Sequence, residues 1–147
     1  MSKDYDYDLA LTEPFTAATW SQLLEGATLQ GWSLLTDEQG AAIIQDGDQN
    51  RRVAMPVHHA GRYLANLSVG TVTLQRPSGE MARLMVIHDP DEVSLTLSVP
   101  VSQLPLREDY QPGKPLRDTF DLQSYDALIA AFEQQLALRR VAEGSAP

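Results

Sequence analysis

Residues 121–141 read DLQSYDALIAAFEQQLALRRV, and this stretch decides the fold more than any other part of the chain. Its apolar side chains recur at the spacing of one helical face, and Arg139 continues the same stripe: Tyr125, Leu128, Ile129, Phe132 and Leu136. Asp121 or Ser124 is a candidate N-cap, and Arg139 and Arg140 suit the negative end of a helix. The sequence therefore predicts an amphipathic helix over residues 121–141.

The clearest strand lies upstream of this helix. Residues 93–99 read VSLTLSV, in which apolar and hydroxyl residues alternate strictly. Such alternation is typical of a strand with one buried face and one solvated face. Between the strand and the helix, residues 100–120 contain four prolines and little periodicity, which favours an ordered connector.

The first half of the chain predicts one helix followed by hairpins. Residues 16–30 carry apolar positions at helical spacing, with Thr16 as a candidate N-cap and Gly31 as a candidate stop. Turn-forming residues then separate candidate strands at 32–36, 41–45, 51–57, 71–75 and 81–88. Residues 57–69 fit either a strand or a short helix that ends at Gly70, and we favour the helix. At the start, aspartate alternates with tyrosine over residues 4–8, which suits an edge strand.

These elements predict a single α+β domain over residues 1–147, with flexible ends at about 1–4 and 143–147. An antiparallel sheet is flanked by an N-terminal helix, a short middle helix and a long C-terminal amphipathic helix. Trp20, Leu24, Leu128 and Phe132 are expected to be buried where the first and last helices pack on the sheet.

Composition narrows the class of function. The net charge of −9 disfavours nucleic acid and anionic membrane surfaces and favours basic partners. No apolar run approaches the roughly 20 residues of a membrane span, and the acidic N-terminus lacks the pattern of a signal peptide. The chain has no cysteine. We therefore expect a soluble, cytoplasmic protein.

No stretch carries a recognisable catalytic, metal or cofactor motif. The segment from Asp46 begins like a calcium loop, but Arg51 and Val57 replace the glycine and glutamate that such a loop needs, so a hairpin turn is favoured. His58 and His59 are adjacent, whereas a helical zinc pair needs i, i+4 spacing. We therefore predict a non-enzymatic protein without a metal or cofactor.

Acidic residues gather at the predicted turns. If they form a binding surface, the candidates for contact with a partner protein are Asp37, Glu38, Asp46, Asp48, Asp89, Asp91 and Glu92. Such negative rims would steer a basic partner and make its association rate depend on salt.

The order of elements resembles that of type III secretion chaperones of the Tir-chaperone kind and of the related YbjN-like fold. The resemblance is carried by TWSQLL at 19–24, GWSLL at 31–35, AAII at 41–44, YLANL at 63–67 and the last helix at 124–141. It implies a small acidic homodimer that binds an extended effector segment along apolar surface. A strand at 71–75 and the long connector at 100–120 depart from the family pattern.

Two other classes of function remain open. One is an immunity protein or inhibitor that covers a basic toxin such as a nuclease, because its acids would imitate phosphate. The other is a small ligand-binding domain or enzyme whose site is assembled from scattered residues.

Overall fold

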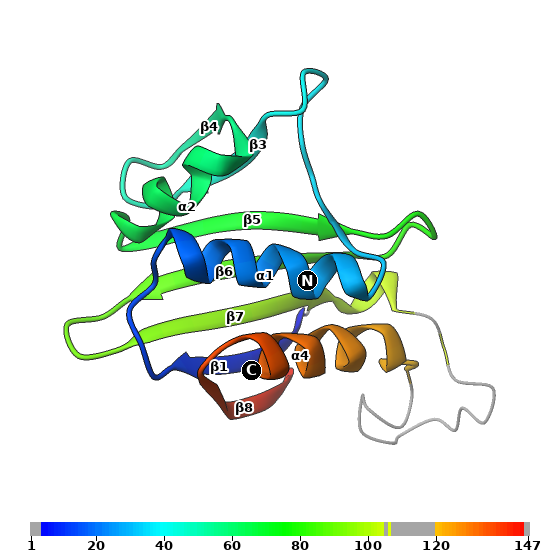
Figure 1. Ribbon diagram of the computed structural model, residues 1–147. Coiled ribbons are helices and arrows are strands. Elements are labelled where there is room, and N and C mark those ends of the chain that lie inside the picture. The colour runs from blue at the N-terminus through cyan, green and yellow to red at the C-terminus, as the bar shows by residue number, and fades with distance from the viewer. Residues whose placement is uncertain (1–3, 105, 107–119, 146–147) are drawn as a thin grey trace.

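The computed structural model describes residues 4–104, 106 and 120–145 (Figure 1). In chain order the elements are β1 (Asp4–Leu11), α1 (Ala17–Leu29), β2 (Ser33–Leu34), β3 (Ala42–Asp46), β4 (Arg51–Met55), α2 (Val57–Ala65), β5 (Val69–Gln75), β6 (Met81–His88), β7 (Val93–Pro100), the 3-10 helix η1 (Val101–Gln103), α4 (Gln123–Gln135) and β8 (Leu138–Ser145). The fold is α+β, as the sequence predicts. The helices within these ranges lack the length and apolar character of a membrane span.

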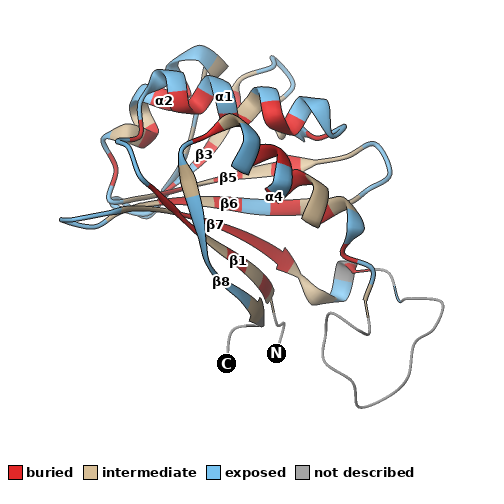
Figure 2. Ribbon diagram, turned by 60° about the horizontal axis from the view of Figure 1, so that its bottom comes forward, coloured by how far each residue is buried: buried red, intermediate tan, exposed pale blue. Residues whose placement is uncertain are grey.

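The strands form one antiparallel sheet in the order β4-β3-β5-β6-β7-β1-β8, and β2 pairs with β5 beside this path. Helices α1, α2 and α4 lie on the same face of the sheet (Figure 2). We call this the covered face. The opposite side, which no helix of the described residues covers, is called the open face. Two layers of this kind bury one side of each strand, which explains the strict alternation in the sequence.

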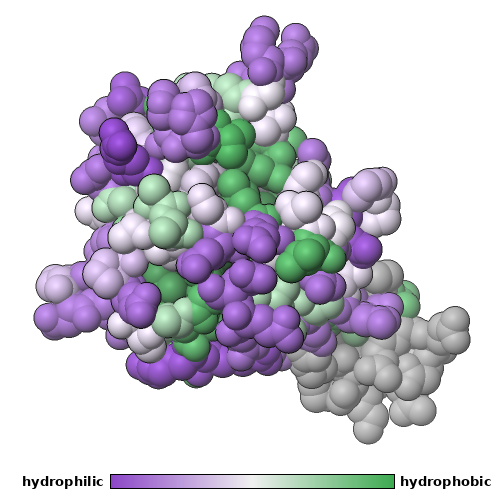
Figure 3. Space-filling model, viewed as in Figure 1, coloured by the Kyte–Doolittle hydropathy of each residue, from purple (hydrophilic) through white to green (hydrophobic). Residues whose placement is uncertain are grey.

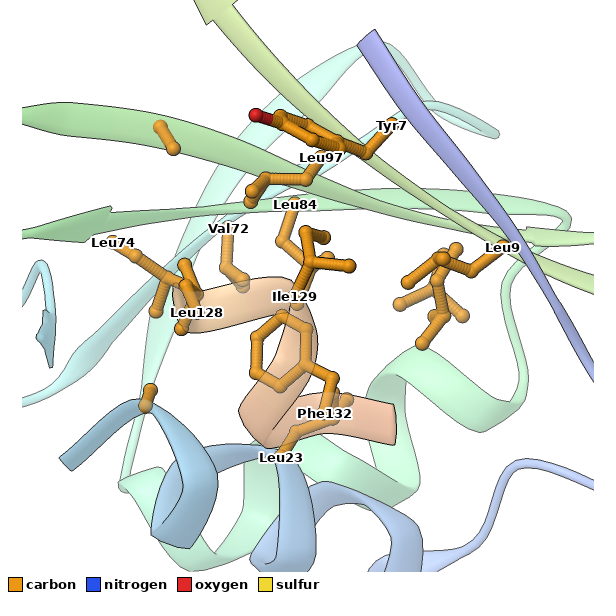
Figure 4. Packing of buried hydrophobic residues seen from close by; sticks show 14 of the residues in the cluster. Tyr7, Leu9, Leu23, Val72, Leu74, Leu84, Leu97, Leu128, Ile129 and Phe132 are labelled. Carbon is orange, nitrogen blue, oxygen red and sulfur yellow. The ribbon is translucent and has the colours of Figure 1, made fainter. Parts of the chain in front are cut away.

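The core lies between the covered face and the helices. Every second residue of the central strands is buried there, and Figure 4 shows these side chains meeting Leu128, Ile129 and Phe132 of α4. All three helix residues are fully buried, as are Tyr7 and Leu97. Each such side chain contributes roughly 1.5–3 kcal/mol relative to an exposed one. The packing of α1 and α4 on the sheet agrees with the sequence analysis, except that Leu24 is only half-buried.

Helix α1 has the ends that its sequence predicts. Thr16 and Thr19 form a reciprocal capping box at the N-terminus, and Gly31 follows the helix at a φ of +79°. The indole of Trp20 donates to the backbone carbonyl of Val57 at 3.0 Å and ties α1 to α2. At this crossing a Cβ on Gly61 would lie 2.7 Å from the Cβ of Trp20, so only glycine permits the close approach.

The prediction of a helix continuing to Val141 is wrong. Helix α4 ends at Gln135, Leu136 is extended, and residues 138–145 form β8 against β1. Beyond Leu136 the helical spacing does not determine the structure, because residues 138–145 pair with β1 instead. Two tyrosines of β1 bind the segments on either side of this change. Tyr7 donates to Asp126 of α4 at 2.8 Å, and Tyr5 donates to Glu143 of β8.

Pairing with β8 also moves β1 away from the edge of the sheet, where we expected it. Its aspartates therefore do not protect an edge. They lie on the open face and cover the hydroxyl face of β7, so Thr96 and Ser98 are buried rather than solvated. Asp4 and residues 143–145, which we expected to be flexible, belong to β1 and β8.

The ambiguous segment 57–69 is resolved by the structure. Residues 57–65 form α2, which confirms the preferred helix, but the helix ends at Asn66 rather than at Gly70. Gly70 lies inside β5, which begins at Val69. In the connector, η1 and an isolated bridge between Leu106 and Phe120 are described, and the rest of that prediction lies outside the described residues.

Candidate functional site on the open face of the sheet

The open face is hollowed where two strands share one neighbour. Strand β3 pairs with β5 only at Thr71 and Gly70, and β2 pairs with the other end of β5 at Gln75 and Leu74. Between β2 and β3 the chain leaves the sheet as a projecting turn around residues 37–40 (Figure 1). The resulting hollow encloses about 370 Å³, and its lining residues are Leu35, Ile43, Gln45, Arg52, Thr71, Thr73, Arg83 and Met85.

The lining combines apolar, hydroxyl and cationic groups. Leu35, Ile43 and Met85 are partly exposed apolar side chains from three different segments. Arg52 and Arg83 are exposed cations, and none of the eight lining residues has a carboxylate. A nucleophile also needs a neighbouring base, and no His, Asp, Glu or Lys lines the hollow.

Cross-strand pairing fixes the positions of these residues. Thr71 lies opposite Met85 on β6 and opposite Gln45 on β3, and Gln45 lies opposite Arg52 on β4. Paired residues share a face of a sheet, so the row crosses the open face from β6 to the edge strand β4. Thr73 and Arg83 form the next pair, and both also line an adjoining hollow of about 210 Å³.

An acidic row on β1 lies beyond Arg83. Asp4 forms an ion pair with Arg83 at 2.9 Å, and Asp8 accepts a hydrogen bond from the hydroxyl of Thr96 at 2.8 Å. Asp6 lies between Asp4 and Asp8 on β1. Burial raises the pKa of the Asp6 carboxyl group, and the hydrogen bond from Ser98 lowers it by a smaller amount. The neighbouring aspartates add to this increase because like charges disfavour ionisation. The open face is therefore acidic at β1 and basic around the hollow.

The acids that the sequence analysis singled out lie in three turns rather than in one surface. Asp46 is buried on the covered side of β3 and accepts hydrogen bonds from the Tyr63 hydroxyl at 2.6 Å and from the backbone of Asp48 and Gln49. These bonds, the one from Tyr63 above all, lower the pKa of Asp46. Its carboxylate holds the β3–β4 turn together, as the hairpin interpretation of this segment requires.

Asp48 and Asp37 also bind backbone groups. The carboxylate of Asp48 accepts from the N–H groups of Ser68 and Val69 and joins the β3–β4 turn to β5. The carboxylate of Asp37 accepts from the N–H groups of Gln39 and Ala41 within the projecting turn, where Glu38 is exposed.

Asp89, Asp91 and Glu92 are exposed in the turn between β6 and β7. This turn lies at the same end of the sheet as Asp48, because the backbone of His88 donates to Ser68. The projecting turn with Asp37 and Glu38 is separate from both (Figure 1). The structure therefore places Asp46, Asp48 and the Asp89–Glu92 turn at one end of the sheet, and Asp37 and Glu38 in a separate turn.

The histidines and carboxylates of residues 4–104, 106 and 120–145 include no group of three that could hold a metal ion. His58 and His59 lie on α2 with ring centroids 4.1 Å apart, and both are exposed. His88 packs instead against Phe15.

A polar cluster lies where α4 begins. Arg76 binds Glu80 at 2.7 Å and the hydroxyl of Ser124 at 2.7 Å. The Tyr125 hydroxyl nearby is buried, and loss of hydration raises its pKa to about 12. A phenol with this pKa stays protonated at neutral pH, so it does not supply a general base.

Comparisons with protein-family models, with curated proteins and with solved structures give no match to this chain.

The hollow was not predicted from the sequence, because it arises where β2 and β3 share one side of β5, and no local pattern indicates this. The one available signal was Thr71 and Thr73, two residues apart on one strand and therefore on one face. On the helix side, Figure 3 shows mostly polar surface, with apolar side chains visible between the β3–β4 hairpin and the projecting turn.

Proposed function

We propose that this chain is a non-enzymatic protein-binding module that binds its partner on the open face of the sheet. The observation that carries the proposal is the hollow, whose apolar floor is exposed on a face without a helical layer. Apolar surface left open on a sheet is typical of a protein-binding site. This agrees with a chaperone-type role in which a segment of another protein is held by apolar contacts.

Affinity capture from the source cells tests the proposal. The Met85→Asp variant places a charge on the floor of the hollow, and Gln22→Asp adds the same charge to an exposed position of α1 on the opposite side. The wild type and Gln22→Asp should capture the same partner, and Met85→Asp should lose it. Circular dichroism and thermal unfolding establish that both variants are folded. Capture of the same proteins by all three would contradict the proposal.

The exposed acids at residues 89–92 favour a second candidate, the inhibitor of a basic protein. The triple variant Asp89→Asn, Asp91→Asn, Glu92→Gln removes this charge without touching the hollow. For an inhibitor, association should slow steeply with added salt in the wild type and weakly in the variant. A complex held on the open face should show the same salt response in the wild type and in the variant, since the substitutions leave the hollow unchanged.

A further inference from the structure

Taking the proposed function as its starting point, we propose that the hollow binds an extended partner segment in which an apolar side chain is flanked by carboxylates two residues away on either side. Overall charge alone would predict the reverse. A chain of net charge −9 attracts cations at long range, whereas the groups that a segment would touch in the hollow are Arg52 and Arg83.

Both arginines are available to such a segment. Arg52 is exposed, its cross-strand partner is the neutral Gln45, and no ion pair holds it within the described part of the chain. Arg83 lines the hollow, is 52% exposed and gives one terminal nitrogen to Asp4, so its other terminal nitrogen has no ion-pair partner within the described residues. A planar guanidinium of this kind recognises a carboxylate through two parallel hydrogen bonds.

The two arginines are close enough for their long side chains to reach alternate residues of one extended chain. Arg52 is on β4 and Arg83 is on β6, with β3 and β5 between them. Three interstrand steps of about 4.8 Å separate the two strands by about 14 Å, and Arg83 lies two residues, about 7 Å, along from the row of Arg52, so their Cα atoms are roughly 16 Å apart. In an extended segment the residues at i−2 and i+2 are about 13 Å apart and share a face with residue i. A segment that crosses the strands therefore places its two carboxylates near the two arginines.

The floor of the hollow suits the residue at the centre of this segment. Met85 and Ile43 offer apolar contact there, and Met85 adapts to side chains of different shapes. Thr71 and Thr73 lie beside them with hydroxyl groups that donate or accept hydrogen bonds. An apolar side chain such as leucine would be covered here, while the acids beside it bind the arginines.

A nuclear magnetic resonance titration with two heptapeptides tests this inference. The first is Ser-Glu-Ser-Leu-Ser-Glu-Ser and the second is Ser-Lys-Ser-Leu-Ser-Lys-Ser, each added to the ¹⁵N-labelled full chain at low salt. The glutamate peptide should bind at least about tenfold more tightly, as expected for two exposed ion pairs formed in one case and two repulsions in the other. Its largest shifts should fall on the amides of Thr71, Thr73 and Met85.

Two variants control for charge. In Arg52→Glu the preference for the glutamate peptide should fall to less than about threefold, because one attraction becomes a repulsion. In Arg62→Glu, which makes the same change at an exposed position of α2 on the covered side, the preference should be unchanged. Both variants should keep the circular dichroism spectrum of the wild type.

Equal binding of the two peptides, tighter binding of the lysine peptide, binding of neither, or shifts confined to another surface would each overturn the inference. These outcomes leave the proposed function intact if Met85→Asp still loses the captured partner. If Met85→Asp keeps that partner, the proposed function fails as well. If the acidic strand β1 of a second copy occupies the hollow in place of the peptide, the protein dimerises as its concentration rises. This outcome would also overturn the inference.

Discussion

Strand β5 shows the two faces of the sheet side by side. Val72 and Leu74 point to the covered face and are almost fully buried, whereas Thr71 and Thr73 point to the open face and are half-exposed. The same backbone therefore supports a packed core on one side and a hollow on the other. Burial dictates the residues of the covered face. The threonines and arginines of the open face contribute little packing, so their replacement should change the free energy of unfolding far less.

The largest effect that tests this contrast is expected on the covered face. Phe132→Ala should lower the free energy of unfolding by about 3–5 kcal/mol, because the ring is fully buried among the strands and its loss leaves a cavity. Urea unfolding followed by circular dichroism measures the change. Gln134→Ala, at an exposed position of the same helix, should change stability by less than about 0.5 kcal/mol. A loss below about 1 kcal/mol for Phe132→Ala would mean that α4 does not pack on the sheet as described.

The second effect tests how tightly the covering helices are packed on each other. Gly61→Ala adds a methyl group where the Cβ of Trp20 is 2.7 Å away, and the backbones of α1 and α2 must separate to admit it. We expect a loss of about 1–3 kcal/mol in urea unfolding, although alanine favours a helix more than glycine does. The control is His59→Ala on the exposed side of α2. Stabilisation by Gly61→Ala would show that this crossing is loose.

Much of the fold was predictable because local signals and burial agree. The candidate N-cap Thr16, the alternation at 93–99 and the helical spacing of Leu128 and Phe132 each gave the right element. The prediction failed where a distant partner decides the structure. Arg139 continues the helical spacing of α4, yet the pairing of residues 138–145 with β1 makes this segment a strand.

The candidate site was less accessible from sequence. Acidic residues at turns suggested a binding rim, but a carboxylate in a turn commonly binds the backbone, as Asp37, Asp46 and Asp48 do. Arg52 lies in a predicted hairpin strand, and only the sheet order places it around the same hollow as Arg83. The chemistry of each segment can be predicted from the sequence. Predicting that five segments line one hollow also requires the order of the strands in the sheet.

Two aspartates on opposite faces should respond to acid in opposite directions. The pKa of Asp46 is lowered in the folded state, so this group stabilises the fold above its unfolded pKa of about 4, and the contribution is lost as pH falls through the folded pKa. The pKa of Asp6 is raised, so its ionised form costs stability at neutral pH, and protonation relieves that cost. Compared with the wild type, Asp46→Asn should lower Tm at pH 7, and Asp6→Asn should keep or raise it.

Thermal unfolding between pH 2.5 and 7 measures both differences. The difference for Asp46→Asn should narrow as pH falls below about 4 towards the lowered folded pKa of Asp46. The difference for Asp6→Asn should already narrow above about 4, as pH falls through the raised folded pKa of Asp6. A constant difference across this range would assign the effect to lost hydrogen bonds rather than to ionisation. A drop in Tm at pH 7 for Asp6→Asn would show that the acidic row on β1 is favourable as it stands.

The smallest expected change in stability belongs to the open face, and it is the most informative one about function. Thr73 and Leu74 are neighbours on β5, but Thr73 lines the hollow and Leu74 is 1% exposed in the core. Leu74→Ala should cost about 2–5 kcal/mol in urea unfolding, and Thr73→Ala should stay within about 0.5 kcal/mol of the wild type. If both substitutions cost the same, the open face is packed, and the hollow is not a free surface. If Thr73→Ala is neutral for stability but weakens capture of the partner, then the hydroxyl of Thr73 contributes to binding and not to folding. At a core position the effects on stability and on binding cannot be measured separately, since a substitution there changes both.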